Sequence, residues 1–201
     1  SGNFLTETYL SLRRLENEAI RLELGGESVL DVGQADDWIQ VSIQQFFGIE
    51  INDFAVSVAK TALWIAEDQM MKETQDLLYD PDWNFLPLKT YTKIHEGDAL
   101  RIDWNSILPN YACHYVISNP PFVGQKQLMP DQRADMTLIL GKKHSKMDFV
   151  VCWYMKAINY VNDTDIKVAF VSTNSITQGE QATQLGQRLL IDHKCYILFA
   201  Y

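Results

Sequence analysis

The residues best suited to chemistry are Asn119, Pro120, Pro121 and Phe122, which directly follow the apolar segment YVIS. Proline cannot donate a backbone hydrogen bond and it restricts φ, so two successive prolines make a rigid exit from a strand. The side-chain oxygen of Asn119 and the carbonyl oxygen of Pro120 are then two acceptors held in place. An aromatic amine is a weak nucleophile because its lone pair is delocalised, and two fixed acceptors would draw it towards a tetrahedral, nucleophilic shape.

Phe122 offers an aromatic face beside these two acceptors. A base of a duplex can reach such a loop only after it is flipped out, and an aromatic ring then replaces the lost stacking. The alternative is an ordinary strand-terminating turn with Phe122 in the core, and the tetrapeptide alone leaves both interpretations open.

Two acidic residues follow other predicted strands. Glu50 lies near the end of the segment FFGIEI, and Asp98 follows KIHEG. Ligands of parallel α/β sheets bind beyond the carboxyl ends of the strands, so Glu50, Asp98 and Asn119 are the first functional candidates. A solvated charge or a helix cap is the commoner role of either acid taken alone.

The hydrophobic periodicity predicts the elements that must position these residues. The predicted strands lie in the segments 46–51, 93–100, 114–122, 167–173 and 196–201, of which 93–100 and 114–122 each run from an apolar strand into turn residues. The predicted helices are 3–24, 148–160, 179–191 and a second long helix that is capped by residues 52–53 and carries apolar residues from Val56 to Ala66. The predicted loops are 78–88 and 123–146. Strands that alternate with long helices predict an α/β fold with a mostly parallel sheet. A length of 201 residues, of which 47% are hydrophobic, predicts a single domain over 1–201.

The net charge of −9 is the observation that most opposes a nucleic-acid partner, because Lys and Arg supply most of the affinity for phosphates. The N-terminus does not look like a signal peptide and no apolar run is long enough to span a membrane, so a cytoplasmic protein without a membrane partner is expected. The spacing of the histidines and of the three cysteines predicts no metal site and no disulfide.

The tetrapeptide Asn119-Pro120-Pro121-Phe122 resembles the catalytic motif of the amino-methyltransferases, a branch of the class I S-adenosylmethionine-dependent fold. Over nearly the whole chain, the segments FVGQKQL, GDALRIDW and MDFVVCWYMKA are similar to stretches of the MmeI-like adenine methyltransferases of restriction-modification systems. This resemblance implies a Rossmann-like sheet, S-adenosylmethionine as the cofactor, and methylation of the exocyclic N6 amine of adenine in double-stranded DNA.

The resemblance also implies a cofactor site. The opening Ser1-Gly2-Asn3-Phe4 resembles the end of a family loop, Asp-Pro-x-x-Gly-x-Gly-x-Phe-Leu, that holds the cofactor. By the same resemblance, Glu50 with the adjoining Ile51 would receive the ribose hydroxyls. Asp98 would accept the adenine amine of the cofactor, with Ala99 beside the ring.

Basic residues follow the candidate catalytic turn. Lys126, Arg133, Lys142, Lys143 and Lys146 all lie between 123 and 147, where they could contact phosphates near a flipped base. A solvated surface loop is the alternative for this segment.

Family members commonly join nuclease, methyltransferase and target-recognition parts, so the resemblance implies a truncated domain linked to such parts in a parent protein. The sheet is then expected to lack its first central strand, between the strands that end at Glu50 and at Asp98. The segment VLDVG at 29–33 looks like a cofactor strand, but glycines are missing from the Gln34-Ala35-Asp36 continuation. Residues 25–45 are therefore interpreted as a family insertion.

Two rival functions stay open at this point. Methyltransferases that act on ribosomal-RNA guanine or on protein glutamine share the Asn-Pro-Pro-aromatic motif, although Ser1-Gly2-Asn3-Phe4 disfavours them. A non-catalytic module that binds a partner and keeps the fold as a scaffold would also suit the acidic charge.

The resemblance predicts that the 201-residue chain by itself is inactive and binds S-adenosylmethionine weakly or not at all, because the upstream strand and the first half of the cofactor loop are not in its sequence. Isothermal titration calorimetry of the isolated chain measures this. Tight binding at one cofactor per chain would contradict it.

Overall fold

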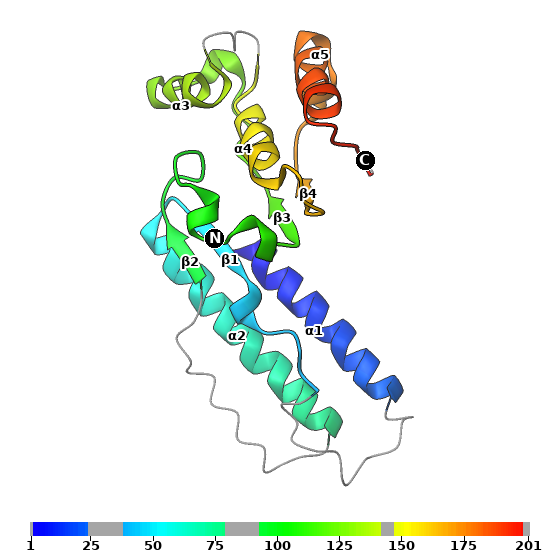
Figure 1. The fold of residues 1–201 in the computed structure, drawn as a ribbon. Helices are drawn as coiled ribbons and strands as arrows, with labels where there is room; N and C mark the ends of the chain where they lie inside the picture. Colours follow the sequence, from blue (N-terminus) through cyan, green and yellow to red (C-terminus); the bar gives the residue numbers. More distant parts are fainter. Residues whose placement is uncertain (1, 24–37, 79–92, 142–146, 199–201) are drawn as a thin grey trace. The chain divides into compact units, whose positions relative to one another are not determined.

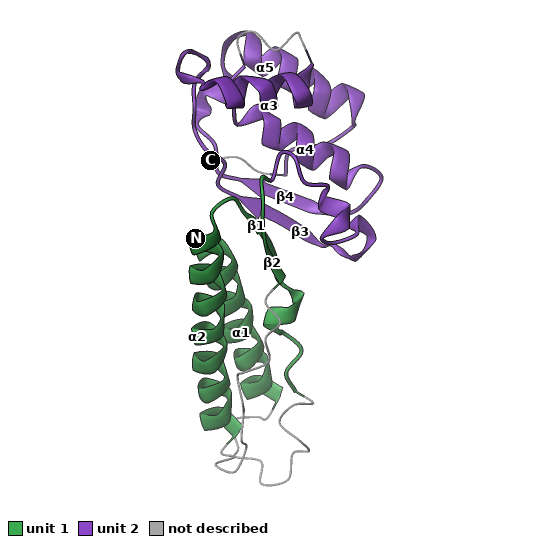
Figure 2. Ribbon diagram, turned by 90° about the vertical axis from the view of Figure 1, so that its left-hand side faces the viewer, with its two compact units in different colours: residues 1–98 green, residues 99–201 purple. Residues whose placement is uncertain are grey.

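The computed structural model describes residues 2–23, 38–78, 93–141 and 147–198 of the chain. Two compact units are present, Ser1–Asp98 and Ala99–Tyr201, and each is considered by itself (Figure 2). Each unit contains one pair of parallel strands together with its helices, which confirms the predicted α/β class with parallel pairing. A single domain over 1–201 stays a prediction. Within the described ranges, no helix has both the length and the hydropathy of a membrane span.

Two long helices run side by side in the same direction in the first unit (Figure 1). Helix α1 spans Asn3–Glu23 and α2 spans Asp53–Leu78, close to the predicted helices. Gly2 lies against Ala59 at one end of the pair, and Arg13 bonds Thr74 towards the other. Both helices therefore begin at the same end of the unit.

The first unit also holds two short strands. Strand β1, Phe47–Glu50, pairs in parallel with β2, Lys93–Glu96, and Glu50 lies opposite Glu96. The central strand that we expected the chain to lack was placed between the strands that lead to Glu50 and to Asp98, and that position is wrong, because β1 and β2 are direct hydrogen-bonded neighbours. Neighbouring strands are only about 4.8 Å apart, which leaves no room for another strand between them.

A buried arginine connects the two helices. The Arg13 side chain is fully buried, forms an ion pair with Glu16 and donates to Thr74 Oγ1 at 2.6 Å. Thr74 in turn bonds Asn17 Oδ1 at 2.7 Å. A charge removed from water is tolerated only with such partners, so these bonds specify how α1 lies along α2.

The second unit is built on another parallel pair, β3 (Tyr115–Ser118) and β4 (Lys167–Phe170). Helix α4, Val151–Val161, packs on β4 through Tyr154 and Phe170, whose ring centroids are 5.2 Å apart. Helix α3 spans Pro130–Leu140, and α5 spans Gly179–Gly186 before a π-helical segment, Gln187–Asp192. Short 3₁₀ helices occur at Ile43–Gln45, Trp104–Ser106, Asn110–Ala112, Gln125–Gln127 and Asn174–Thr177.

Two sequence predictions about the second unit are wrong. The predicted loop 123–146 contains α3, which begins with Pro130 at its first position and buries Met136 and Leu140. Its apolar residues also include the exposed Leu138, so no clean helical stripe marks it. The predicted last strand is not formed over 196–198, whose side chains are exposed.

Some predictions lie outside the described residues. These are most of the loop 78–88, residues 25–37 of the proposed insertion, including the segment VLDVG, and the end of the last predicted strand at 199–201.

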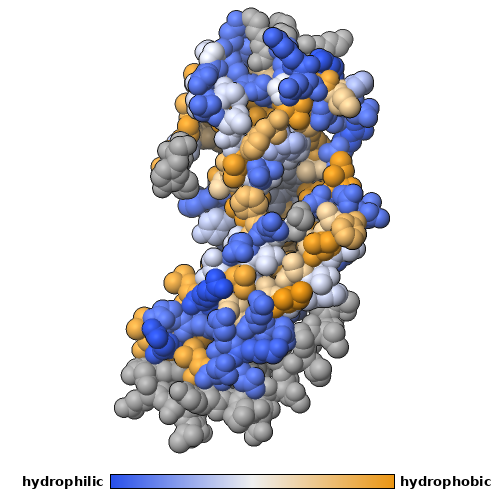
Figure 3. Space-filling model, turned by 180° about the vertical axis from the view of Figure 1, so that it is seen from behind, coloured by the Kyte–Doolittle hydropathy of each residue, from blue (hydrophilic) through white to orange (hydrophobic). Residues whose placement is uncertain are grey.

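Apolar side chains reach the surface of both units, where Figure 3 shows them as orange patches among polar atoms. On α2 and just before it, Ile51, Phe54, Val58 and Ile65 are exposed, and most of them are spaced to lie on one helix face. Apolar surface grouped in this way is typical of faces that contact further protein.

Glu67 of α2 should make the stability of the protein depend on pH. Burial raises its pKa to about 7, and the positive charge of Arg13 opposes part of that shift. Between these two values the Glu67 carboxyl keeps its proton in the folded state, whereas in the unfolded state it releases the proton near the ordinary pKa of 4.5. The sign of this linkage means that stability falls as pH rises from about 5 to about 8.

The variant Glu67→Gln removes this titration, so its advantage in unfolding free energy over the wild type should grow across that pH range, as measured by urea denaturation. The exposed neighbour Asp68, which pairs with Lys72 on the surface, provides the control Asp68→Asn. Equal pH dependence in the wild type and Glu67→Gln would contradict the prediction.

Gly2 should not tolerate a side chain. Its φ is +78°, and a Cβ added there would lie 2.5 Å from the Cβ of Ala59. We expect Gly2→Ala to lower the unfolding free energy by about 1 to 3 kcal/mol, since α1 and α2 would have to separate. Gly141 also has φ +78° but nothing within 4 Å, so Gly141→Ala carries the same backbone strain without the clash. Denaturation midpoints that fall equally in both variants would contradict the role of the close approach.

Candidate active site

The tetrapeptide Asn119-Pro120-Pro121-Phe122 leaves the carboxyl end of β3 as an irregular segment. The parallel pairing with β4 continues for one bond beyond the strands, from the Val171 amide to the Ser118 carbonyl at 3.0 Å. The two prolines have no N–H to extend it. The chain therefore separates from the sheet at Asn119.

The exposure of this turn differs from residue to residue. Pro120 is buried, whereas Asn119 and Pro121 are exposed and the Phe122 side chain is 48% exposed. Within the described ranges, neither the Asn119 side chain nor the Pro120 carbonyl has a hydrogen-bond partner. The exposed side-chain oxygen of Asn119 is thus open to a donor from a ligand, and the unpaired carbonyl of the buried Pro120 follows it directly in sequence. The interpretation of Phe122 as a core residue is not supported.

The predicted acidic residues of the first unit meet at one edge of the β1–β2 pair. The Gly97 amide donates to the Glu50 carbonyl at 2.8 Å, so Asp98 follows directly beside the end of β1. The Glu50 carboxylate accepts the Ile51 amide at 3.0 Å, which orients it at the strand end. Asp98 is half-buried and Ile51 is exposed.

The beginning of α1 reaches the same edge. Gly48 of β1 lies so close to Leu5 that an added Cβ would be 3.0 Å from its side chain. The Gly2 carbonyl accepts the Thr6 amide at 3.0 Å and so opens the helix, and Asn3 and Phe4 of the first turn are exposed. A helix N-terminus carries a partial positive charge and unpaired N–H groups, which suit a polar or anionic ligand. Ser1 lies outside the described residues.

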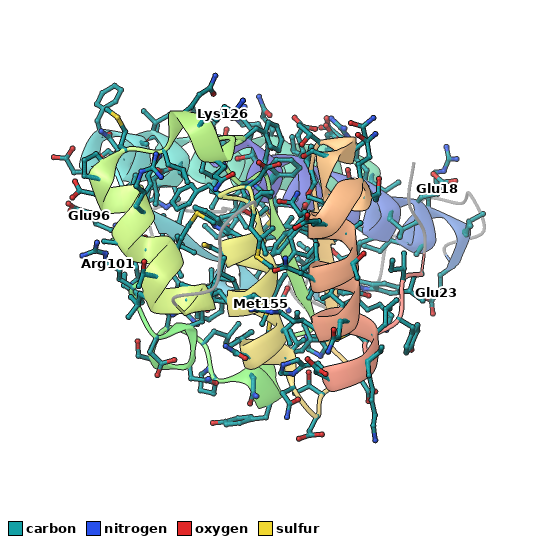
Figure 4. All side chains as sticks on the ribbon, turned by 90° about the horizontal axis from the view of Figure 1, so that it is seen from above. Glu18, Glu23, Glu96, Arg101, Lys126 and Met155 are labelled. Carbon is teal, nitrogen blue, oxygen red and sulfur yellow. The ribbon has the colours of Figure 1, made fainter. Side chains whose placement is uncertain are left out.

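The segment after Asp98 is anchored in the second unit. The Ala99 carbonyl accepts the indole N–H of Trp104 at 2.8 Å, and Leu100 is buried in the core. Arg101, labelled in Figure 4, forms an ion pair with the buried carboxylate of Asp135 on α3 at 2.8 Å. The position of Ala99 is therefore fixed by the bond to its own carbonyl, by the burial of Leu100 and by the ion pair of Arg101.

The basic residues that we expected near the turn are only partly placed. Lys126, labelled in Figure 4, is exposed in the 3₁₀ helix that follows the turn, and Arg133 is exposed on α3. Lys142, Lys143 and Lys146 lie outside the described residues.

Sequence reasoning missed the polar residues that follow β4. Ser172, Thr173 and Asn174 lie at the same sheet edge as Asn119, because β3 and β4 are parallel neighbours in register. The rule that polar residues directly after a strand are functional candidates applies to these residues too. It did not select Ser172 and Thr173, because the predicted strand ran on to Thr173, three residues beyond the observed end of β4 at Phe170.

The buried Cys152 is not suited to act as a nucleophile. Burial raises the pKa of the Cys152 thiol to about 12, so the thiol stays protonated and packs as a core residue. In the parts of the chain that are described, no cluster of His, Cys, Asp and Glu is arranged to hold a metal ion. The oxygens of Asn119 and Pro120, which have no partner within the described ranges, are the stronger candidates for chemistry.

Known proteins resemble the chain throughout its length. The family model of the MmeI DNA-methyltransferase domain matches residues 1–201. "DNA methyltransferase A" of Bacillus subtilis (strain 168) is 42% identical over 195 residues, which are 94% of this chain but 21% of that protein. This chain therefore spans about a fifth of the length of that relative.

A solved structure shares the fold. The type IIL restriction-modification enzyme MmeI, determined in complex with DNA, matches with a TM-score of 0.84 and 43% identity. The match covers 94% of this chain and 25% of the MmeI chain. Because the match to MmeI covers residues of both units, both units belong to one Rossmann-like methyltransferase fold. The family model, the relative and the solved structure agree, and the chain belongs to the MmeI family of DNA-methyltransferase domains.

Proposed function

We propose that this domain transfers the methyl group of S-adenosylmethionine to the exocyclic amine of adenine in DNA, as the modifying part of a restriction-modification protein. The observation that carries the proposal is the turn after β3, where the oxygens of Asn119 and Pro120 have no partner within the described ranges. An adenine amine has two hydrogens to donate, and two adjacent acceptors match them.

The proline backbone supports this role for the turn. Acceptors that stabilise developing charge are most effective when they need no rearrangement during the reaction. Pro120 is buried and Pro121 has a restricted φ, so the carbonyl between them is held still while the Asn119 side chain faces outwards. In this arrangement the two residues bind and orient the amine and draw its lone pair away from the ring.

Phe122 supports a nucleobase as the ligand. About half of its side chain is exposed, at 48%, although it lies two residues after the buried Pro120. A flipped base loses its stacking partners, and an exposed aromatic ring beside the acceptors compensates for that loss.

The first unit fits the cofactor that the family implies. Glu50 presents an oriented carboxylate at the end of β1, and Asp98 and the α1 N-terminus lie at the same edge. A carboxylate accepts both hydroxyls of a ribose, and a second acid accepts an adenine amine. S-adenosylmethionine, when bound, supplies an electrophilic methyl group. We assign Gly2, Asn3, Phe4, Glu50, Ile51, Asp98 and Ala99 to its binding, together with Ser1.

DNA as the substrate is supported by the relatives. The MmeI structure was determined in complex with DNA, and the Bacillus subtilis relative is named a DNA methyltransferase. The net charge of −9 means that this domain contributes little phosphate affinity of its own. We assign the exposed Lys126, together with Lys142 and Lys143, to contacts with phosphates beside the flipped base. We assign the rest of the DNA binding to other parts of the full-length protein.

A methyl-transfer assay on three substrates tests the proposal. The full-length gene product is incubated with labelled S-adenosylmethionine and with duplex DNA, ribosomal RNA or a glutamine-containing protein. Digestion of the DNA to nucleosides followed by mass spectrometry should give N6-methyladenine. Methyl-guanine in RNA or methyl-glutamine in protein would overturn the substrate assignment, and transfer to none of the three would favour the scaffold interpretation.

Asn119→Ala should abolish methylation while DNA binding is preserved. Loss of one of two preorganised groups at a reacting centre typically costs at least about a hundredfold in rate. Single-turnover methylation gives the rate, and fluorescence anisotropy gives the affinity for DNA. Asn159 is an exposed asparagine on α4 without a partner among the described residues, so Asn159→Ala is the matched control. A methylating Asn119→Ala variant would remove the basis of the proposal.

A further inference from the structure

Asp148 connects the catalytic turn to the segment that follows β4. The amide of the next residue, Phe149, donates to the Val123 carbonyl at 3.0 Å, and Val123 directly follows Phe122. The Asp148 carboxylate accepts Ser175 Oγ at 2.8 Å and Gln181 Nε2 at 3.3 Å, both through Oδ2. We call Asp148, Ser175 and Gln181 the clasp.

Gln181 holds Asp148 at two points. Its side-chain oxygen accepts the Asp148 amide at 2.5 Å, while its nitrogen donates to the carboxylate of the same residue. Gln181 is only 5% exposed. A buried side-chain amide is costly unless both of its ends are paired, and here Asp148 pairs both ends.

The clasp is not an ordinary helix cap. Asp148 precedes α4, and a capping carboxylate would accept amides of the first helical turn. The residue at the cap position is Val150, which makes no side-chain capping bond, and the carboxylate oxygen that is bonded receives both of its bonds from beyond β4. The hydrogen bonds of the Asp148 carboxylate are therefore tertiary.

The other carboxylate oxygen, Oδ1, faces the backbone of the turn. A Cβ added to Gly124 would lie 3.8 Å from it, in ordinary contact. The Asp148 carboxylate thus lies near Gly124, on the far side of Phe122, while the neighbouring Phe149 amide bonds the Val123 carbonyl. The bond to the Val123 carbonyl is the one that holds the chain directly after Phe122.

The catalytic tetrapeptide lies between two anchors. Upstream, the Val171 amide bonds the Ser118 carbonyl at 3.0 Å, and downstream, the Phe149 amide bonds the Val123 carbonyl at 3.0 Å. Only the four residues 119–122 separate these bonds. The upstream anchor is part of the sheet, whereas the downstream anchor depends on where Asp148 is held.

We propose that Asp148 is a positioning residue for the Asn119-Pro120-Pro121-Phe122 turn, and that Ser175 and Gln181 act through it. Through the clasp, the residues that follow β4 and the catalytic turn form a single rigid body. Reacting groups must be held to within about 0.5 Å, so a loosened downstream anchor should lower the rate of methyl transfer more than the binding of DNA or cofactor. This role rests on the proposed function, but the anchoring itself does not.

Hydrogen exchange in the full-length protein tests the anchoring without reference to substrate. In Asp148→Ala, exchange of the peptide 119–128 should accelerate by about tenfold, while the amides of α4 keep wild-type rates. Ser175→Ala removes one bond to the carboxylate and should give a smaller acceleration in the same peptide. Asp165, an exposed acid at the opposite end of β4, supplies the control Asp165→Ala. Unchanged exchange in 119–128, or equal acceleration throughout the second unit, would overturn the proposal.

Single-turnover methylation of DNA tests the consequence. Asp148→Ala should lower the rate by about tenfold with dissociation constants for DNA and S-adenosylmethionine within about threefold of wild type. Asp148→Asn keeps one acceptor oxygen and should recover part of the rate. A rate equal to wild type in Asp148→Ala would overturn the positioning role. A wild-type protein that methylates no DNA would refute the proposed function instead, and the exchange experiment would still decide whether the clasp anchors the turn.

Discussion

Two successive prolines end the hydrogen-bond ladder between β3 and β4, and the arrangement of the candidate site depends on this. The ladder can continue only as far as the Ser118 carbonyl, because Pro120 and Pro121 have no amide hydrogen to offer. The chain must leave the sheet at Asn119 with its acceptors unpaired. A turn of ordinary residues could satisfy these oxygens internally, whereas here the Asn119 side chain and the Pro120 carbonyl have no partner among the described residues.

The parallel direction of the strands then decides which residues share the site. Parallel neighbours end at the same edge of their sheet, so Glu50 lies beside Gly97 and Asp98 in one unit, and Asn119 lies beside Val171 and Ser172 in the other. The parallel packing of α1 on α2 adds a helix N-terminus to the first edge. Within each unit, residues far apart in sequence meet because paired parallel strands have their carboxyl ends at the same edge.

Much of this organisation could be predicted from the sequence. Helices α1 and α2 carry apolar residues near helical spacing, and β1 to β4 each lie within a segment that was predicted to contain a strand, so these elements could be located from the sequence. Helix α3 could not be predicted, because Leu138 is exposed while Asp135 is buried against Arg101. A partly buried ion pair compensates there for a missing apolar stripe, and pairing across 34 residues leaves no local pattern.

By itself, the sequence determined the chemistry that is available: an asparagine before two prolines and an aromatic ring, and acids after two further strands. Those properties are local, since they depend on covalent structure and on residues next to each other. Only the tertiary structure decided that β1 pairs directly with β2, that Gly2 must lack a side chain because Ala59 approaches it, and that Asp148 is joined to Ser175 and Gln181. These are contacts between distant segments, and their geometry exists only once the chain has folded.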